Sequence, residues 1–393
     1  MLGLRSNESF PLGPHAAALA ALSALATLPG CDSRPRSISE SDLGAYEASA
    51  SAWPDGLVVA WYDTRDGNPE IYVRLLDAAG QPAGAERRLT RTATESYEAD
   101  VAATADGFAV AWYEKSPVGP PHAQLAWWRR DGGEPAWRHE LAPELPSRNP
   151  VVRAYGDALF VAWIEGNSRD ERVRAGWWNL DGSPRTPTVT VGAASDTTWN
   201  LNAAVASDDT AYVVFDARVG TYADELYLAT LGAGGGVTLT RLGDDDGHHS
   251  KYPDLALGDG VAALTWFDER DGNREVYLAT GPLAELRTRG TAAARRVTET
   301  TGASIGAYVS VNAGRVGLAW CDDTGGTYDI YTQTFRQDGS PEAPASRVST
   351  NAESMIPAIQ PWGLGFVTVW NELDGELRPG GRNRSEVVVA FLP

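Results

Sequence analysis

Seven near copies of one short string recur along the chain at almost constant spacing. Each copy is an apolar stretch that ends in an acidic residue, as in "VVAWYD", "AVAWYE" and "ALTWFD". The acids are Asp63, Glu114, Glu165, Asp216, Asp268, Asp322 and Glu372. Their separations are 51, 51, 51, 52, 54 and 50 residues. A period near 50 is typical of blade-like repeats, whereas helical solenoids repeat at roughly 33 to 47 residues.

Each repeat contains four short strand signals. In the fifth repeat they are "DLALGD", "GVAALTWF", "REVYLAT" and "ARRVTE", which are rich in β-branched or aromatic residues and are separated by Gly, Asp or Asn. No segment of a repeat has a helical pattern. The string "DGN" of the first and fifth repeats contains an Asp-Gly pair, which favours the hairpin between the second and third strands. The sequence therefore predicts an all-β fold, a seven-bladed β-propeller with four antiparallel strands in each blade.

The two ends of the chain supply complementary parts of one blade. The seventh repeat stops after its third strand, "SEVVVAFLP", and residues 36–41, "RSISES", resemble the fourth strands "RRLTRT" and "RRVTET" of other repeats. We expect residues 36–41 to complete the last blade, because closure of the ring removes an exposed strand edge.

The first thirty residues differ in kind from the rest. Residues 16–28 form an apolar run whose length suits a signal peptide and is too short to span a bilayer. The run ends in "LPGC", residues 28–31, which resembles the lipobox of bacterial lipoproteins and marks Cys31 as the lipidated residue. We divide the chain into a signal peptide, residues 1–30, and a propeller, residues 31–393. An ordinary cleaved signal peptide and a misassigned start codon are the alternatives.

The segment "TRDGNPEIYVRLLDAAGQPAGAERRLT", residues 64–90, resembles the repeat of the TolB-like (PD40-type) β-propellers. Those repeats carry an Arg-Asp-Gly-Asn turn, an Ile-Tyr strand, an Asp-Gly turn and a terminal Arg-Leu-Thr. The resemblance implies an envelope protein with a binding role. TolB itself has six blades and a separate N-terminal domain, so its particular partner is not carried over to this chain.

Composition limits the classes of partner. The chain has 52 acidic and 33 basic residues and a net charge of −19, which disfavours nucleic acid as a ligand. Beyond residue 30 no apolar run is long enough to span a membrane. Cys31 and Cys321 are the two cysteines, and we expect Cys321 to be a buried apolar residue. The sequence calls for no cofactor.

Two rings of residues are predicted on the face where second strands end and first strands begin. We expect the seven repeat acids to be mainly architectural, because recurrence in a repeat protein more often marks packing than chemistry. The entrances of the first strands carry the aromatic residues Tyr46, Tyr97, Trp199, Tyr252 and Tyr308, with Asn149 and Ile356 in the other two repeats. Aromatic faces stack on sugars or bind cations, so this second ring is the candidate ligand-binding site.

The loop "DDDGHHSKYPD", residues 244–254, has no counterpart in the other repeats. His248, His249 and Asp246 are a weak candidate set for a divalent metal. Alternatively, His249 acts as a base beside Tyr252 in an enzyme. Solvation of adjacent histidines in an acidic loop is the simpler interpretation.

The Asp-box motif of sialidase-like propellers does not occur in the sequence, which disfavours a sialidase. The pairs Trp127-Trp128 and Trp177-Trp178 fall in third strands, where alternate side chains enter opposite blade interfaces.

These observations predict an exported, lipid-anchored propeller on the periplasmic or surface side of a bacterial cell envelope. Its predicted role is that of a non-catalytic binding or scaffold module for a glycan or an envelope protein. The alternative is a polysaccharide lyase or glycoside hydrolase that uses His248, His249 and Tyr252.

Overall fold

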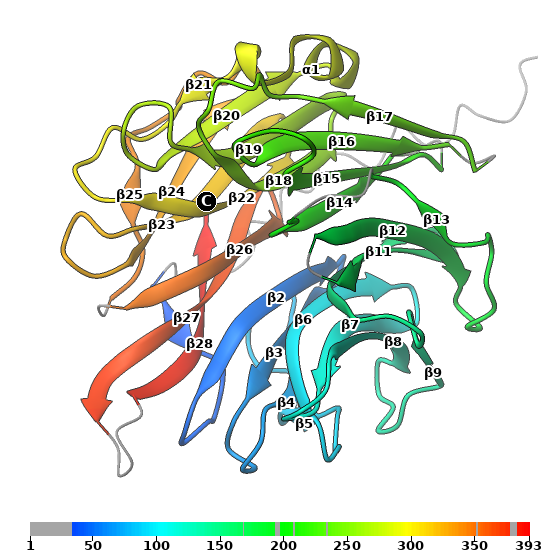
Figure 1. Ribbon diagram of the computed structural model, residues 1–393. Coiled ribbons are helices and arrows are strands. Elements are labelled where there is room, and N and C mark those ends of the chain that lie inside the picture. Colours follow the sequence, from blue (N-terminus) through cyan, green and yellow to red (C-terminus); the bar gives the residue numbers. More distant parts are fainter. Residues whose placement is uncertain are drawn as a thin grey trace, which may run out of the picture.

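The computed structural model describes residues 34–167, 169–192, 197–206, 209–232, 235–350, 353–377 and 383–393. The predicted signal peptide and Cys31 lie outside these residues. Within them the chain forms seven four-stranded antiparallel sheets arranged as the blades of a propeller (Figure 1). Among the described residues, no helix has the length and apolar character needed to cross a membrane.

Six blades are simple meanders in chain order. The first three blades consist of β2 (Ala45–Trp53), β3 (Gly56–Asp63), β4 (Glu70–Asp77), β5 (Arg87–Arg88); β6 (Glu95–Thr104), β7 (Gly107–Lys115), β8 (Pro121–Arg129), β9 (Trp137–Glu140); and β10 (Ser147–Tyr155), β11 (Ala158–Asn167), β12 (Asp170–Asn179), β13 (Val189–Thr190). The next three consist of β14 (Leu201–Val205), β15 (Ala211–Ala217), β16 (Glu225–Leu231), β17 (Val237–Arg241); β18 (Ser250–Gly258), β19 (Val261–Asp268), β20 (Glu275–Gly281), β21 (Arg295–Arg296); and β22 (Ser304–Asn312), β23 (Arg315–Asp322), β24 (Asp329–Arg336), β25 (Ser346–Arg347).

The seventh blade confirms the predicted closure. It contains β26 (Ser354–Trp362), β27 (Gly365–Leu377) and β28 (Asn383–Leu392), and its fourth strand is β1 (Arg36–Ser37). Arg36 pairs with Val389, and the N–H of Ile38 donates to the carbonyl of Val387 at 2.8 Å. The first described strand and the last strand of the chain therefore lie side by side.

The core consists of apolar clusters between neighbouring blades. Trp128 packs between the first and second blades, whereas its neighbour Trp127 packs between the second and third. Trp177 and Trp178 divide in the same way between two interfaces. The prediction that these tryptophan pairs are packing residues is thus confirmed, because alternate residues of a strand face opposite sides.

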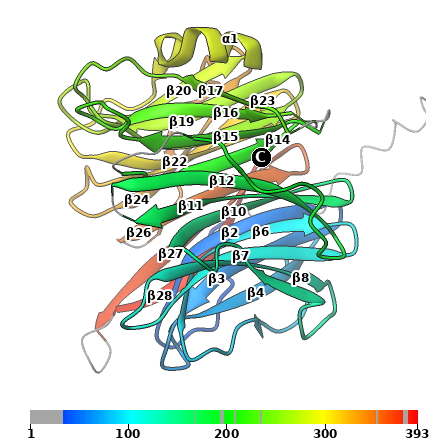
Figure 2. The same cartoon turned by 45° about the vertical axis from the view of Figure 1, so that its right-hand side comes forward.

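The prediction that no repeat contains a helix is wrong for the fifth repeat. Helix α1 (Leu283–Arg289) and the 3₁₀ turn η1 (Gly290–Ala293) lie between β20 and β21, at the outer edge of the ring (Figure 2). Pro282 precedes the helix, Gly290 ends it with a φ of 52°, and Leu286 buries its side chain against the neighbouring blade. This insertion accounts for the long spacing of 54 residues between Asp268 and Asp322.

The repeated acidic turn joins second and third strands, as predicted, and each of its residues has a structural task. In the first repeat, Arg65 pairs with Asp63 at 2.5 Å, and Asp66 accepts a hydrogen bond from the Tyr72 hydroxyl. Gly67 adopts a φ of 93° that glycine tolerates best, and Asn68 donates to the carbonyl of Thr94 at 2.7 Å, at the entrance of the next blade. The fifth repeat makes the corresponding contacts with Arg270, Asp271, Gly272 and Asn273.

Candidate functional site

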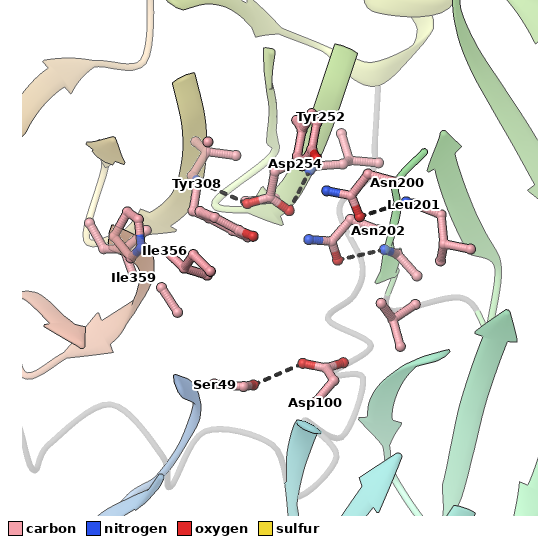
Figure 3. Close-up of a pocket in the computed structure, with 18 of the residues that line it drawn as sticks. Ser49, Asp100, Asn200, Leu201, Asn202, Tyr252, Asp254, Tyr308, Ile356 and Ile359 are labelled. Atoms are coloured by element: carbon pink, nitrogen blue, oxygen red, sulfur yellow. Dashed lines mark hydrogen bonds between the residues drawn. The ribbon is translucent and has the colours of Figure 1, made fainter. Parts of the chain in front are cut away.

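A cavity of about 810 Å³ lies at the centre of the ring and is lined by first strands from all seven blades. Figure 3 shows part of its wall, with Tyr308 and Ile356 on one side of the open space, Asn200 and Asn202 on another, and Tyr252 and Asp254 between them. The volume is within the range of ligand-binding pockets. The propeller axis is therefore the candidate site.

A β-bulge at the start of the first strand shapes the mouth of this cavity in six blades. In the first blade, Tyr46 pairs with Tyr62 and Ser49 with Ala60, so two residues of β2 oppose one residue of β3. The bulged residue has a positive φ in each of these blades: Glu47, Glu98, Asn149, Tyr252, Gly306 and Ile356. All six line the cavity. Bulges commonly change the direction of side chains near functional sites, and here the bulged residues form part of the cavity mouth.

The fourth blade positions its entrance by another device. Backbone N–H groups of Trp199 and Asn200 donate to Asp216 Oδ1 at 2.7 and 3.0 Å. Asp216 Oδ2 accepts the N–H of Tyr252 from the next blade at 2.9 Å. Burial raises the pKa of Asp216 to about 6 against the opposing effect of these hydrogen bonds. One buried carboxyl group thus sets the backbone at two neighbouring positions of the mouth.

The other repeat acids are architectural, in agreement with the prediction. Asp63, Glu114, Glu165, Asp268 and Glu372 each accept a hydrogen bond from the tryptophan indole two residues earlier. Asp322 accepts hydrogen bonds from Ser304 Oγ and the N–H of Thr324. Because these carboxyl groups accept hydrogen bonds from their own blades, they stabilise the strands and turns of those blades.

The five aromatic residues of the predicted ring do not all line the cavity. Trp199, Tyr252 and Tyr308 line the cavity. Tyr46 and Tyr97 each precede a bulged glutamate and lie outside the described cavity lining. Sequence alone did not reveal the offset, because the bulge changes which side chain enters the channel at a given distance from the repeat acid.

Trp199 and Tyr252 present their rings to solvent from supported positions. Their side chains are 49% and 39% exposed. Lys251 Nζ lies 4.5 Å from the centre of the Trp199 ring and 2.9 Å from Asp224 Oδ2. Tyr252 stacks on Phe267 with 5.7 Å between ring centres. Large exposed aromatic rings that are held in place are suited to binding.

A row of four tyrosines crosses from the first blade to the second beside the mouth. The ring centres of Tyr46 and Tyr62 are 5.3 Å apart, those of Tyr62 and Tyr97 5.1 Å, and those of Tyr97 and Tyr113 5.7 Å. Burial, together with the hydrogen bond that its hydroxyl donates to Glu95 Oε2 at 3.0 Å, raises the pKa of Tyr97 to about 12.

Glu47 and Glu98 are two acids at the mouth that the sequence analysis did not select. Burial, followed by the charge of Glu98, raises the pKa of Glu47 to about 8. Burial raises the pKa of Glu98 to about 7, while Arg148 and a hydrogen bond from Tyr113 act in the opposite direction. The signal that could have identified them is the string "YEA", which begins at Tyr46 and again 51 residues later at Tyr97.

The cationic side chains of the lining are already paired among the described residues. Arg153 Nη1 lies 2.7 Å from Asp100 Oδ2, and the same carboxylate accepts Ser49 Oγ at 2.9 Å on its other oxygen. Arg274 Nε lies 3.0 Å from Glu269 Oε1.

The cavity wall also contains Asp254, whose carboxyl group accepts hydrogen bonds from the N–H groups of Leu255 and Val309 (Figure 3). Burial raises the pKa of Asp254 to about 6.

The histidine loop does not bring its histidines to the cavity wall. His249 Nδ1 lies 2.8 Å from Asp224 Oδ2, and the same carboxylate pairs with Arg218 at 3.2 Å. The N–H of His248 donates to Asp246 Oδ1 at 2.9 Å. Tyr252 lines the cavity, but His248 and His249 are not in the described lining. No group of three or more His, Cys, Asp or Glu side chains within the described ranges is arranged to hold a metal ion.

Cys321 is buried, as expected of a small apolar residue, and forms no disulfide with any described residue. Burial raises the pKa of its thiol to about 12, so the reactive thiolate form is disfavoured.

Comparison with known proteins identifies the fold at low sequence similarity. No protein-family model matches the sequence. No curated protein matches it either. Among solved structures, the polysaccharide lyase Uly1 is similar with a TM-score of 0.56 and 9% identity over 88% of this chain and 90% of that one. A protein of unknown function from Dyadobacter fermentans has a TM-score of 0.52 and 9% identity, over 91% and 99% of the two chains. The α-L-arabinofuranosidase of Fusarium graminearum has a TM-score of 0.51 and 12% identity, over 75% and 92%.

These likenesses show the fold. At such identities the activities of the similar proteins do not pass to this chain, because a propeller is a scaffold for many unrelated sites.

Proposed function

We propose that this protein binds a carbohydrate in its central cavity as a non-catalytic module. The observation that carries the proposal is the pair of exposed, supported rings of Trp199 and Tyr252 at the cavity mouth. Their faces suit the CH surfaces of sugars, and nearby amide groups suit the hydroxyl groups.

The amide groups are oriented for this task. Asn200 Oδ1 accepts the N–H of Leu201 at 2.8 Å, and Asn202 Oδ1 accepts the N–H of Ala203 at 2.8 Å. With the oxygens engaged by the backbone, the NH₂ ends of both side chains face the open space (Figure 3). They are donors for the oxygen atoms of a ligand.

A glycan array tests the proposal. The domain from residue 34 onward is screened for retention on neutral, acidic and basic polysaccharides, and the Trp199→Ala and Tyr252→Ala variants are screened beside it. Tyr222→Ala is the matched control, because Tyr222 is 83% exposed in the same blade as Trp199 but is not part of the described lining. We expect the two mouth variants to lose retention and the control to keep it. Retention on no polysaccharide, or equal loss in all three variants, contradicts the proposal.

Cleavage of the bound glycan is a second candidate function. The observation in its favour is that Glu47 and Glu98 line one cavity and both have raised pKa values, of about 8 and about 7. A carboxyl group that keeps its proton near neutral pH can act as a general acid, and a second carboxylate can act as base or nucleophile. Release of a reducing sugar from any retained polysaccharide, abolished by Glu98→Gln, would establish this function in place of simple binding.

The proposal places the propeller on the outside of the cytoplasmic membrane, anchored through Cys31. Its support is the apolar run of residues 16–28 followed by "LPGC", and the resemblance of the repeats to TolB-like envelope proteins. In this arrangement only residues 32–35 separate the lipid from β1, the outermost strand of the last blade. Fractionation of cells that produce the full chain or the Cys31→Ser variant is the test: membrane association is expected for the first and its loss for the second.

A further inference from the structure

The mouth of the cavity is not uniform in charge. At the junction of the first and second blades, Glu47 and Glu98 lie beside the rings of Tyr62, Tyr97 and Tyr113, a set that we call the acidic corner. The Tyr113 hydroxyl hydrogen-bonds to Glu98, and the charge of Glu47 raises the pKa of all three tyrosines. Two carboxyl groups and three aromatic rings therefore share one small region.

Glu47 is the less neutralised of the two carboxyl groups of the acidic corner, because a cation, Arg148, lowers the pKa of Glu98 but not that of Glu47. Glu47 Oε2 is buried and has no hydrogen-bond partner in the described part of the chain. Arg148, the cation that acts on Glu98, also donates to Glu171 Oε1 at 2.8 Å. Burying an unpaired carboxylate is costly, so the site favours any occupant that supplies a positive charge and N–H donors.

We propose that the carbohydrate bound in the cavity carries a primary ammonium group, which the acidic corner recognises. An ammonium group donates up to three hydrogen bonds to carboxylate oxygens. Glu47 and Glu98 both line the cavity, so their carboxyl groups are available to such a ligand. The inference rests on the proposed carbohydrate-binding function and names its ligand class: an oligosaccharide of amino sugars whose amines are free.

The remainder of the cavity favours an amino sugar over the ammonium group of a lysine side chain. Asn200 and Asn202 direct their NH₂ groups into the same cavity, and Trp199 and Tyr252 offer ring faces at its rim. A ligand that uses both halves of the cavity needs hydroxyl groups and CH faces as well as a cation. A lysine side chain provides the cation and an apolar stem alone.

A bare metal ion fits the corner less well. Only two carboxyl groups are present, and within the described ranges no larger group of ligating side chains is arranged for a metal. Two carboxyl groups supply fewer oxygen ligands than Ca²⁺ or Mg²⁺ requires.

Two tetrasaccharides that differ only in the acetylation of their amines provide the test. One is a β-1,4-linked glucosamine tetramer with free amines, and the other is the same tetramer with every amine acetylated. Dissociation constants for the domain from residue 34 onward are measured by calorimetry at pH 7 and low salt. We expect the free-amine tetramer to bind at least about tenfold more tightly, which corresponds to one charge-assisted contact of about 1.4 kcal/mol or more.

Substitutions test whether Glu47 and Glu98 cause the preference for the free-amine tetramer. In the Glu47→Gln/Glu98→Gln double variant we expect the two tetramers to bind with equal affinity. Glu95→Gln is the matched control: it removes a negative charge that lies 3.0 Å from the Tyr97 hydroxyl but outside the described cavity lining, and it should keep the preference. Because the wild-type comparison needs no variant, poor folding of the double variant would not block the test.

The outcomes separate the two proposals. Equal binding of both tetramers by the wild type overturns the ammonium inference and leaves carbohydrate binding intact. Binding of neither tetramer while another glycan is retained on the array also overturns it. Retention of no glycan at all removes both. Tighter binding of a lysine-containing peptide than of the free-amine tetramer, abolished by the same double variant, would transfer the site to a protein ligand and overturn the assignment to amino sugars.

Discussion

The backbone N–H of Tyr252 donates a hydrogen bond to the carboxylate of Asp216 at 2.9 Å, across the boundary between the fifth and fourth blades. The same carboxyl group also holds the N–H groups of Trp199 and Asn200. One member of the ring of repeat acids has thus become a positioning residue for the cavity mouth, although the other six serve their own strands and turns.

Replacement of Asp216 by Ala should weaken both stability and ligand binding. Three backbone N–H groups lose their acceptor, so we expect a loss of about 2–4 kcal/mol in the free energy of unfolding and at least a fivefold loss of affinity for the glycan identified on the array. Asp322→Ala, at the equivalent position of the sixth blade, should lose similar stability but keep the affinity. Urea unfolding and calorimetry measure the two quantities, and equal affinity losses in both variants would contradict the positioning role.

Closure of the ring by the N-terminal segment should dominate its stability. Ile38 is fully buried between the last and first blades, and its carbonyl accepts Arg74 Nη1 at 2.8 Å. Ile38→Ala should lower the free energy of unfolding by about 3 kcal/mol, as expected for a large-to-small change in a core. Leu43→Ala, at an exposed position a few residues later, should cost less than about 0.5 kcal/mol. Similar urea midpoints for the two variants would refute the importance of closure.

Glu47 should make stability depend on alkaline pH. Folding raises its pKa from an ordinary value of 4.5 to about 8. Its protonated form therefore favours the folded state, and this contribution is complete below pH 4.5 and is lost as the pH rises through 8. Glu47→Gln cannot ionise, so it should be more stable than the wild type at pH 8.5, by on the order of 1–3 kcal/mol, and equal to it near pH 4.5.

The pH dependence also involves the charged and titratable groups around Glu47. Glu98 on β6 raises its pKa, whereas Arg148 on β10 acts on Glu98 in the opposite direction, and Tyr62, Tyr97 and Tyr113 remain neutral at these pH values. Thermal unfolding at four pH values between 4.5 and 8.5 provides the measurement. A constant difference between variant and wild type at every pH would contradict the assignment to Glu47.

Ile356 should be the most strained of the bulged residues. It is β-branched and has a φ of 53°, a conformation that such side chains rarely adopt. Asn149 occupies the same position in the third blade, and asparagine tolerates this conformation. Ile356→Asn should leave the free energy of unfolding unchanged or raise it by about 1 kcal/mol, because relief of strain offsets lost apolar contact.

A buried isoleucine of the same strand serves as the control for that change. Ile359 is buried in the regular part of β26, so Ile359→Asn should lower the free energy of unfolding by at least about 2 kcal/mol. Equal losses for the two substitutions, measured by urea unfolding, would show that Ile356 stores no strain.

Much of the architecture could be predicted from the sequence because it depends on local and repeating signals. The spacing of the seven acids, the strand signals between them and the match of residues 36–41 to other fourth strands predicted the blades and their closure. The paired tryptophans of the third strands were assigned correctly because alternation along a strand is a property of the backbone. The helix after β20 was missed because seven residues without a repeated counterpart carry too weak a pattern.

The candidate site could be predicted only in part. Trp199, Tyr252 and Tyr308 were placed in the cavity by their position in the repeat, but Glu47, Glu98, Asn200 and Asn202 were not recognised. Whether a residue near the start of a first strand faces the channel depends on the β-bulge, which adds one residue to the strand and changes the direction of those around it.

By itself, the sequence determined the number of blades, their internal strand order and the residues that join the two ends of the chain. These features follow from hydrophobic alternation and turn residues, which act over a few positions. Only the tertiary structure decided that two glutamates 51 residues apart line one cavity beside a row of tyrosines, and that His249 lies against Asp224. Burial and charge at a site arise from groups that different blades bring together, and no local pattern contains that information.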